Sequence, residues 1–597
     1  MDRNTLLFIV LTAAILIGWD ALVIGPQRQA LREQQRIERE AREAAAPGGA
    51  SDLAGVEAEA TLSVEAALAK APARIAIDTP SLKGSINLSG GRIDDLSLKN
   101  YRETLDPESP LIRLLTPREA EHGHYIEQGF VASSEEGAGL TEGLVWAAPA
   151  GAVLTDKTPV TLTARLGDLV FEKIYSVDDT FMFTVKQSVR NEGVADAKVT
   201  PYGLVVQRGI PTDAGKYQIL HEGPLAVVGK QLLERKYKNA VKRTDEAAGE
   251  GGWVGITNKY WLAAAAPPQD QSFKATLKNV GTATAPIFRA NYTLAERTVA
   301  PGQTIELASH LFGGAKDVDI LRSYEAPVEK GGLGIRDLDK AVDWGNFFFL
   351  TRPIFWLLDF FGDHIGNWGV AILLLTLVVK ALLFPLANKA FESMSAMKKV
   401  QPKLEELKTK YGEDKMKLQQ EMMALYQREK INPLAGCLPV LVQIPIFYAL
   451  YKTLFVTIEL RHEPFIWWIK DLSAPDPTSV FNLFGLLPFE PTAAPLIGAF
   501  LGIGVLPLLY GFASWFQMKL NPPAADPMQQ QIMTMLPFVF VFLFASFASG
   551  LVLYWVWSTV LSVFQQWYIM KRNGVSIDWG ERLPFLKGKK PALEKKT

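Results

Sequence analysis

Apolar residues form long runs at the N-terminus and through the C-terminal third of the chain, and short alternating runs in between. The N-terminal run, TLLFIVLTAAILIGWDALVI over residues 5–24, is about long enough to cross a bilayer. Between residues 74 and 320, runs such as RIDDLSL and FMFTVKQSV are separated by Gly, Asn, Asp and Pro. This alternation predicts an antiparallel β-sandwich inserted between membrane segments.

The N-terminal run is read as an uncleaved signal anchor. A cleaved signal peptide is the alternative, but Arg3 is the only basic residue in front of the run, and no convincing small-x-small cleavage site follows it. Asp20 lies near the outer end, where an interface tolerates it. The β-rich region follows this anchor and should therefore lie outside the cytoplasm.

A polar insert divides the C-terminal apolar runs. Residues 387–433 hold ten basic and seven acidic residues, with apolar positions three or four apart, which predicts a charged helical hairpin. The tail from Lys571 has eight basic and three acidic residues. The positive-inside rule places both segments in the cytoplasm. An inside N-terminus followed by six spans also gives an inside C-terminus.

The expected fold is a polytopic α-helical membrane protein with six transmembrane helices and one large β domain on the outer side. A stretch rich in Trp and interrupted by Arg352, Pro353, Asp359 and Asp363 precedes the second span and predicts an interfacial amphipathic helix. The expected segments are an anchor helix at 1–25, a linker at 26–73, the β domain at 74–320, a connection with the amphipathic helix at 321–366, spans at 367–386, 434–458, 495–518, 532–547 and 550–570, the cytoplasmic hairpin at 387–433, an outer loop at 459–494, a cytoplasmic loop at 519–531 and a basic tail at 571–597.

Lys380 is the first candidate functional residue, because it lies within the apolar run GVAILLLTLVVKALLFPLANK. A charge at the centre of a spanning helix costs roughly 2.5–3.5 kcal/mol on insertion scales, and such residues usually face a bundle interior or a watery cavity. The alternative is snorkelling, in which the lysine stem reaches toward the headgroups near Asn388 and Lys389.

Other chemistry is sparse. The single cysteine, Cys437, excludes a disulfide framework within the chain and any multi-cysteine metal site. His122 and His124 form an isolated H-x-H without a third ligand cluster nearby. The acidic residues Asp178, Asp179 and Glu222 are more typical of solvated loops than of a sugar-processing site.

The net charge of −1 gives no global basic field for nucleic acid, and no phosphate-binding G-x-x-x-x-G-K-[ST] is present. We therefore expect no enzyme, no cofactor and no metal.

The C-terminal half resembles the YidC/Oxa-type membrane protein insertases. The resemblance rests on ordered motifs over about residues 344–572: VVKALLFPL, QEMMALYQREKINPLAGCLPVLVQIPIFYALY, ELRHEPFIWWIKDLSAPDP, DPMQQQIMTMLPFVF and SGLVLYWVWSTV. It implies a core of five spans around a hydrophilic groove that is open to the cytoplasm and to lipid. The anchor and the β domain resemble the Gram-negative members, which implies a bacterial inner membrane, cytoplasmic termini and a periplasmic β-supersandwich of the sugar-mutarotase type.

The resemblance also implies site residues. The family's groove carries one basic residue, usually arginine, and Lys380 stands at the matching position. The change keeps the charge but loses the planar fork that binds carboxylates bidentately. Polar neighbours would be Thr376 and Gln443. The positions that match the client-contacting face are Ile444, Phe447 and, where the family often has tyrosine, Trp555.

The implied function is insertion and chaperoning of newly made membrane proteins, alone or with the Sec translocon. The ribosome would be a partner through the basic tail, and DNA would not. Two alternatives stay open. A secondary transporter or channel could use a buried lysine, although we find no repeated halves and no paired buried carboxylates. A membrane-tethered carbohydrate enzyme would need two acids, or an acid and a histidine, at working distance in the β domain.

Overall fold

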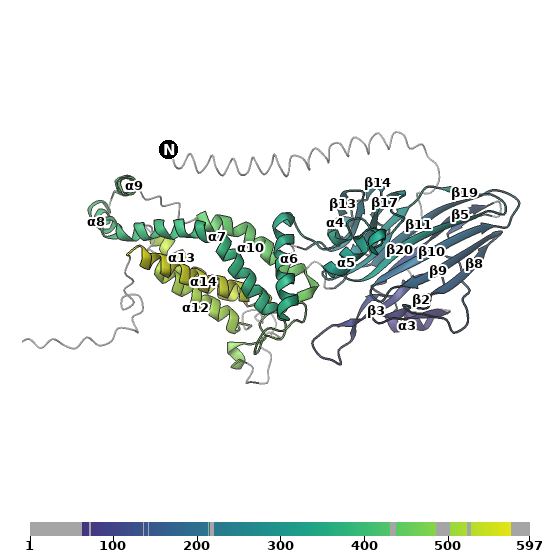
Figure 1. Cartoon of the computed structure of the whole chain (residues 1–597), viewed down its shortest axis with the longest axis horizontal. Coiled ribbons are helices and arrows are strands. Elements are labelled where there is room, and N and C mark those ends of the chain that lie inside the picture. Colours follow the sequence, from purple (N-terminus) through teal and green to yellow (C-terminus); the bar gives the residue numbers. More distant parts are fainter. Residues whose placement is uncertain are drawn as a thin grey trace, which may run out of the picture. The chain divides into compact units, whose positions relative to one another are not determined.

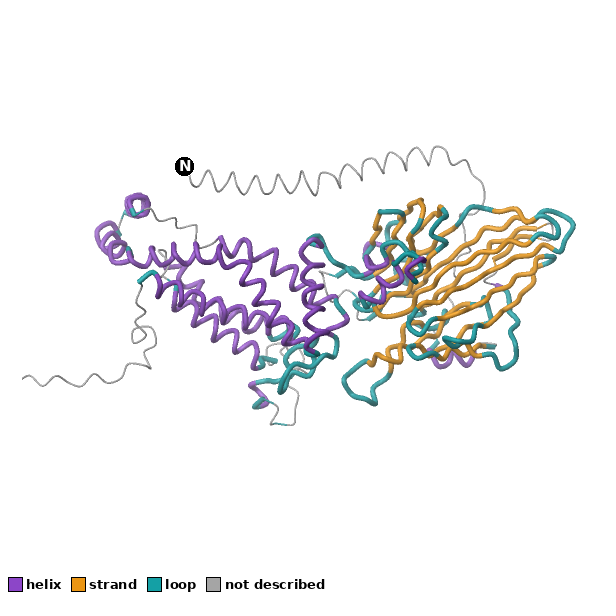
Figure 2. Tube along the Cα trace, viewed as in Figure 1, coloured by secondary structure: helices purple, strands orange, loops and turns teal. Residues whose placement is uncertain are grey.

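The computed structural model describes residues 62–70, 73–134, 137–140, 143–212, 214, 220–412, 414–429, 438–484, 487, 502–521 and 527–574. The predicted anchor helix lies outside these residues, as do most of the predicted linker and of the basic tail. The described residues belong to one compact unit, Ala58–Thr597. Within it, a β-rich part is followed by a helical part (Figures 1 and 2).

Two sheets form the β domain, and the predicted sandwich is confirmed. The larger sheet has the order β14 (Asp245–Glu250), β17 (Ser272–Asn279), β18 (Ile287–Thr293), β11 (Ala197–Arg208), β5 (His124–Ser134), β3 (Arg92–Arg102), β2 (Leu82–Asn87), β1 (Arg74–Asp78) and β7 (Val153–Leu154), with β19 (Arg297–Val299), β4 (Leu111–Leu115) and β6 (Gly137–Leu140) paired to β11, β3 and β5. The smaller sheet has the order β13 (Gln231–Glu234), β12 (Gly223–Val228), β15 (Gly252–Thr257), β16 (Trp261–Ala266), β20 (Thr304–Ala315), β10 (Met182–Asn191), β9 (Leu169–Val177) and β8 (Val160–Leu166). The pairs are antiparallel except β1 with β7, in which Ala76 lies opposite Val153.

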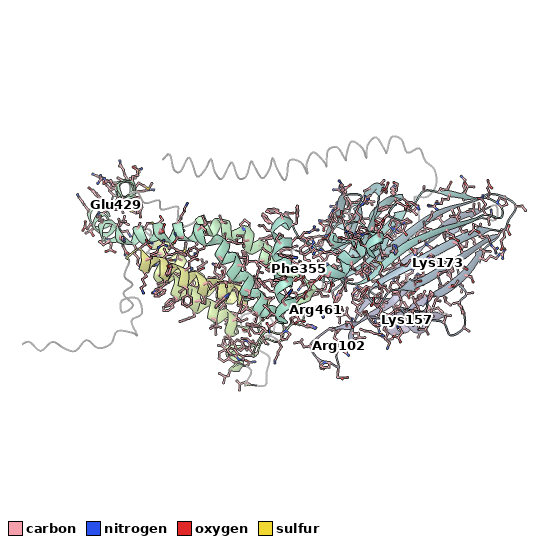
Figure 3. The ribbon with its side chains drawn as sticks, in the orientation of Figure 1. Arg102, Lys157, Lys173, Phe355, Glu429 and Arg461 are labelled. Atoms are coloured by element: carbon pink, nitrogen blue, oxygen red, sulfur yellow. The ribbon has the colours of Figure 1, made fainter. Side chains whose placement is uncertain are left out.

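The alternating apolar and polar residues that predicted the strands correspond to alternating buried and less buried side chains in the structure. In β9, LVFEKIYSV, every second residue from Leu169 to Val177 is buried. This row includes Phe171 and Tyr175, which belong to the hydrophobic core of the domain. It also includes Lys173, whose Nζ donates hydrogen bonds to the carbonyl oxygens of Gln128 at 2.6 Å and Gly90 at 3.2 Å. Figure 3 labels this lysine within the sheet.

The helices outside the sheets are α3 (Val64–Lys70), α4 (Tyr237–Ala240), α5 (Val318–Glu325), α6 (Phe348–Ile365), α7 (Trp368–Lys399), α8 (Gln401–Tyr411), α9 (Lys415–Arg428), α10 (Leu438–Val456), α12 (Val505–Leu520), α13 (Pro527–Phe544) and α14 (Ser549–Arg572), with short 3-10 helices η3 (Val328–Lys330), η4 (Leu338–Ala341), η6 (Ile458–Leu460) and η7 (Val480–Asn482). The helix α6 occupies the region predicted to be an amphipathic helix. The helices α8 and α9 form the predicted hairpin, where Lys403 Nζ lies 2.6 Å from Glu429 Oε1.

The helix α7 is longer than the membrane span expected at residues 367–386. The apolar run ends near residue 386, but the helix continues to Lys399. The segment ANKAFESMSAMKK contains good helix formers, and they extend the helix into the polar insert without a break. By length and composition, α7 is the one helix among the described residues that is suited to cross a membrane, and Val442–Val456 and Gln530–Phe544 are shorter apolar helices. Six spans therefore stay a prediction.

Polar and apolar contacts join the β-rich part to the helices. The core of the β domain includes Phe355 from α6 and Val456 from the end of α10. Arg461 Nη2 donates to the carbonyl oxygen of Arg102 at 2.5 Å, in the region labelled in Figure 3. Lys452 of α10 is 1% exposed, and its Nζ lies 2.6 Å from Asp343 Oδ2. The segment after η4 is thus fixed to α10 by a buried ion pair.

We predict that Lys452→Met lowers the free energy of unfolding by about 3 kcal/mol, because it leaves Asp343 as a buried charge without its cation. The double variant Lys452→Met/Asp343→Asn should recover part of the loss, because it removes the buried charge. The carbonyl oxygen of the introduced asparagine can still accept from one of the two amides that now bind Asp343, those of His221 at Oδ2 and Gly345 at Oδ1. The measurement is thermal denaturation of the detergent-solubilised chain. A double variant that is less stable than Lys452→Met would contradict this account of the pair.

We also predict that Lys173 gives the stability a pH dependence. Burial lowers the pKa of Lys173 from 10.5 to about 7, against the opposing effect of Glu127. Between these two pKa values the unfolded chain binds more protons than the folded chain, so this group makes stability rise with pH from about 7 to 10. The difference in stability between the wild type and Lys173→Met should therefore shift in favour of the wild type over this range. A constant difference would show that Lys173 does not titrate there.

Candidate functional site

Lys380 lies on the face of α7 that meets α14. The helix α7 begins at the N-cap Asn367, whose side chain accepts a hydrogen bond from the Val370 amide. At ~1.5 Å per residue, Lys380 is ~18 Å along the axis from Trp368. Its Nζ donates to Ser562 Oγ of α14 at 2.7 Å, and that hydroxyl donates to the Ser558 carbonyl oxygen at 2.9 Å. The ammonium is thus held by a hydroxyl on the neighbouring helix.

A small hollow opens beside this pair. It is lined by Lys380, Leu383, Leu386, Ala387 and Phe391 of α7, Gln443 of α10, and Ser562 and Gln565 of α14. Lys380 is the only ionisable side chain among these residues. No carboxylate in the described part of the chain forms an ion pair with it. The hollow therefore combines one positive charge, a hydroxyl and two amides with apolar walls.

Beyond the hollow, polar side chains of α7 contact the end of α14. Arg572, at the end of α14, donates to Glu392 Oε1 at 2.6 Å and to Asn388 Oδ1 at 3.2 Å. Asn388 and Glu392 flank Phe391, which lines the hollow. This contact ties the ends of α7 and α14 together. Arg572 and Glu392 are both exposed, so their ion pair contributes little to stability.

Of the two predicted polar neighbours of Lys380, Gln443 lines the hollow and Thr376 does not. Gln443 lines the hollow and donates from Nε2 to Tyr554 Oη at 3.0 Å. Thr376 is fully buried, and its hydroxyl donates to the Ile372 carbonyl oxygen of its own helix at 2.6 Å. It is not among the residues that line the hollow. Its groove role stays a prediction, and the geometry gives it no contact there.

The residues predicted to contact clients lie on α10 and α14. Ile444 is 57% exposed, which leaves it available to a partner. Phe447 packs edge-to-face against Trp555, with ring centroids 4.6 Å apart. Trp555 is also 4.0 Å from the Phe544 ring and 5.6 Å from the Tyr510 ring. These two predicted contacts are thus part of an aromatic cluster that connects α10, α12, α13 and α14.

Sequence reasoning missed Ser562 and Gln565. A usable signal was present, because Ser558, Ser562 and Gln565 recur at intervals of four and three on an otherwise apolar helix. Residues at this spacing share one face. A polar face on a membrane helix indicates a polar neighbour, and in this structure that neighbour is Lys380. Burial leaves Gln565 Nε2 without a hydrogen-bond partner in the described structure.

The other candidate residues of the sequence occupy structural positions. His124 Nδ1 lies 2.8 Å from the Val206 carbonyl oxygen, and burial lowers the pKa of His124 to about 4. Asp178 accepts hydrogen bonds from the amides of Thr180 and Met182 and from Tyr324 Oη at 2.6 Å. His124 thus joins neighbouring strands of the larger sheet, and Asp178 joins the turn before β10 to α5.

The comparisons with known proteins match both parts of the chain. The model of the family described as 60Kd inner membrane protein matches residues 360–575, and that of the YidC periplasmic domain matches residues 74–357. A Caulobacter vibrioides protein named membrane protein insertase YidC is 47% identical over 98% of both chains. A Rhizobium etli protein of the same name is 46% identical over 100% of this chain and 99% of its own. A crystal structure described as an active YidC insertase aligns with 84% of this chain and 93% of its own at 19% identity, with a TM-score of 0.37.

The two family models meet within α6, where one match ends at residue 357 and the other begins at residue 360, and the relatives extend over both sides of it. The hollow at Lys380 lies within the part matched by the 60Kd inner membrane protein model. The family is not one of enzymes, in agreement with the sequence expectation. The chain belongs to the YidC family of membrane protein insertases.

Proposed function

We propose that this protein inserts newly made proteins into the bacterial inner membrane and that the hollow at Lys380 is the polar part of the path. One observation carries the proposal. A single ammonium faces an open hollow from the apolar stretch of α7. Its partner is a hydroxyl, and no carboxylate is among the described residues that line the hollow. An arrangement that only neutralised the charge would place an acidic side chain there.

The physical task is to move a short polar segment through a low-dielectric layer. Transfer of one unpaired peptide group from water to an apolar medium costs roughly 2–7 kcal/mol, so each residue that stays in a polar hollow lowers the barrier. Lys380 attracts acidic residues of the outgoing segment as a point charge, because ammonium lacks the planar fork of arginine. Ser562 and Gln443 add a donor and an acceptor beside it.

Client helices would leave along apolar surface. Exposed apolar side chains line α12 and α13, and they include Leu508, Leu509, Phe512, Met535, Phe538, Val539 and Phe542. Transfer of an apolar client helix into lipid is favourable by roughly 25 cal/mol per Å². No nucleotide site is needed to drive this step. Ile444, which is exposed on α10, is the predicted client contact nearest to Gln443 in the sequence.

The topology completes the proposal. We infer six spans with the bounds predicted from the sequence, a periplasmic β domain, and both termini in the cytoplasm. The hairpin of α8 and α9 would then receive clients on the cytoplasmic side. The ribosome, reached through the basic tail, and the Sec translocon are the proposed partners besides the nascent chain and the bilayer. The insert at 387–433, which contains this hairpin, has ten basic and seven acidic residues, so it presents charged side chains to the cytoplasm.

The test replaces and relocates the charge of Lys380 in proteoliposomes. We predict that Lys380→Met lowers insertion of a client with an acidic outgoing segment about tenfold, and that Lys380→Arg keeps it near the wild-type level. A tenfold loss corresponds to ~1.4 kcal/mol, which is within the range of one charge-assisted hydrogen bond. The measurement is protection of the translocated segment from added protease.

The matched control is the swap Lys380→Ser/Ser562→Lys, which moves the ammonium to the opposite wall of the hollow. If the charge in the hollow is what acts, the swap should restore most of the insertion lost in Lys380→Met. A client with a neutral outgoing segment should be affected less by either change. Full insertion of the acidic client by folded Lys380→Met would contradict the proposed role of the charge, and uptake of a small anion by the wild type would favour a transporter.

A further inference from the structure

The amide nitrogen of Gln565 is a hydrogen-bond donor without an acceptor at the wall of the hollow. Gln565 lines the hollow three residues after Ser562 on α14, so the two side chains share one face of the helix, with Cβ atoms about 5–6 Å apart. Its Nε2 is enclosed by the protein and has no hydrogen-bond partner among the described residues. Such a donor is costly and rare in native proteins. The position therefore has capacity for an acceptor that the described chain does not supply.

The other polar groups of the hollow are already engaged in part. Gln443 donates from Nε2 to Tyr554 Oη at 3.0 Å, and the Ser562 hydroxyl donates to its own helix. Lys380 uses one of the three N–H donors of its ammonium, on Ser562 Oγ at 2.7 Å, and its Nζ forms no other hydrogen bond among the described residues. Spare donors are therefore left at two places, the ammonium of Lys380 and the amide of Gln565.

A carboxylate matches these spare donors. An ionised carboxylate only accepts hydrogen bonds, and two separate donors can hold its two oxygens at once. Lysine presents its charge at a single nitrogen and lacks the fork with which arginine holds both oxygens. A second donor on the neighbouring helix supplies what lysine lacks. Because the last torsion of a glutamine side chain is soft, the NH2 group of Gln565 can turn to meet such an oxygen.

We propose that Gln565 is a specificity-determining residue, and that Lys380 and Gln565 together bind one carboxylate, an aspartate or glutamate side chain in the outgoing segment of a client. The inference rests on the proposed function, because the hollow must first admit that segment. Lys380 supplies the charge, and Gln565 supplies a neutral donor for the second oxygen. A client side chain that cannot accept a hydrogen bond leaves the Gln565 donor unpaired and is therefore disfavoured.

The test compares two clients that differ at one residue of the outgoing segment, which is glutamate in one and methionine in the other. The full chain inserts them into liposomes, and protection of the segment from added protease is measured. We expect Gln565→Leu to lower insertion of the glutamate client roughly fivefold, the loss of one hydrogen bond. The methionine client should stay at or above its wild-type level, because it does not use the amide. Its insertion also shows that the variant folds.

A second variant keeps the shape of the side chain. Gln565→Glu exchanges the NH2 group for an acceptor oxygen, so it should disfavour the glutamate client at least as strongly as Gln565→Leu. Thr559→Val is the matched control, since the Thr559 hydroxyl lies on the same helix, donates to the Trp555 carbonyl oxygen at 2.8 Å and does not line the hollow. This control should insert both clients as the wild type does. A loss of the glutamate client alone in the control would contradict the assignment to Gln565.

The double variant Lys380→Met/Gln565→Leu shows whether both residues hold the same carboxylate. If they do, its loss of the glutamate client should be close to that of Lys380→Met alone, since groups that share a partner do not act additively. Losses that multiply would contradict a shared carboxylate.

Equal effects of Gln565→Leu on the two clients would overturn the inference, because a lipid phosphate or a purely structural role would not distinguish them. A loss of the glutamate client in Lys380→Met but not in Gln565→Leu would overturn this inference and leave the proposed function in place. No loss in either variant would overturn both.

Discussion

The ammonium of Lys380, placed in an apolar helix, is the constraint on which the helical part depends. A charge in that position is costly unless neighbouring helices supply polar atoms and access to water. Here α14 supplies the Ser562 hydroxyl, and α10 supplies the Gln443 amide at the edge of the hollow. Around this site the three helices also pack through apolar and aromatic side chains, such as Phe447 against Trp555. The site thus follows from one lysine and from the helices that surround it.

The junction between the β domain and the helices contains a second buried lysine, Lys452. Lys452 is buried in α10 and is neutralised by Asp343 from the segment after η4. The two lysines differ in their partners, because Lys452 has a carboxylate and Lys380 has a hydroxyl. A neutralised lysine holds parts of a fold together. A lysine without a carboxylate keeps its charge available to a passing segment of a client. Within this chain, Lys452 therefore has an anchoring role and Lys380 the proposed functional one.

Much of the fold was predictable because period-two alternation and long apolar runs are local properties of the sequence. The strand β1 begins at Arg74, where the β domain was expected to start, and the helix α14 contains the stretch expected to be the last span, which stays a prediction. The span expected at 367–386 stays a prediction, and the helix that contains it continues to Lys399, because helix-forming residues follow the apolar run. Lys380 and Gln443 were found from their positions and from a family resemblance. Ser562 was missed, and Thr376 bonds to its own helix instead of lining the hollow. Both outcomes depend on which faces of neighbouring helices pack together, and this is not a local property of the sequence.

The most direct measurement of the central claim is photocrosslinking to a ribosome-bound nascent membrane protein. A photoreactive residue at Leu386, which lines the hollow, is compared with one at Phe564, which is exposed on α14 and does not line it. The account predicts a crosslink from position 386 to the polar segment of the client, and a crosslink from position 564 to lipid. Equal labelling of the client from both positions, or of lipid alone from position 386, would contradict it.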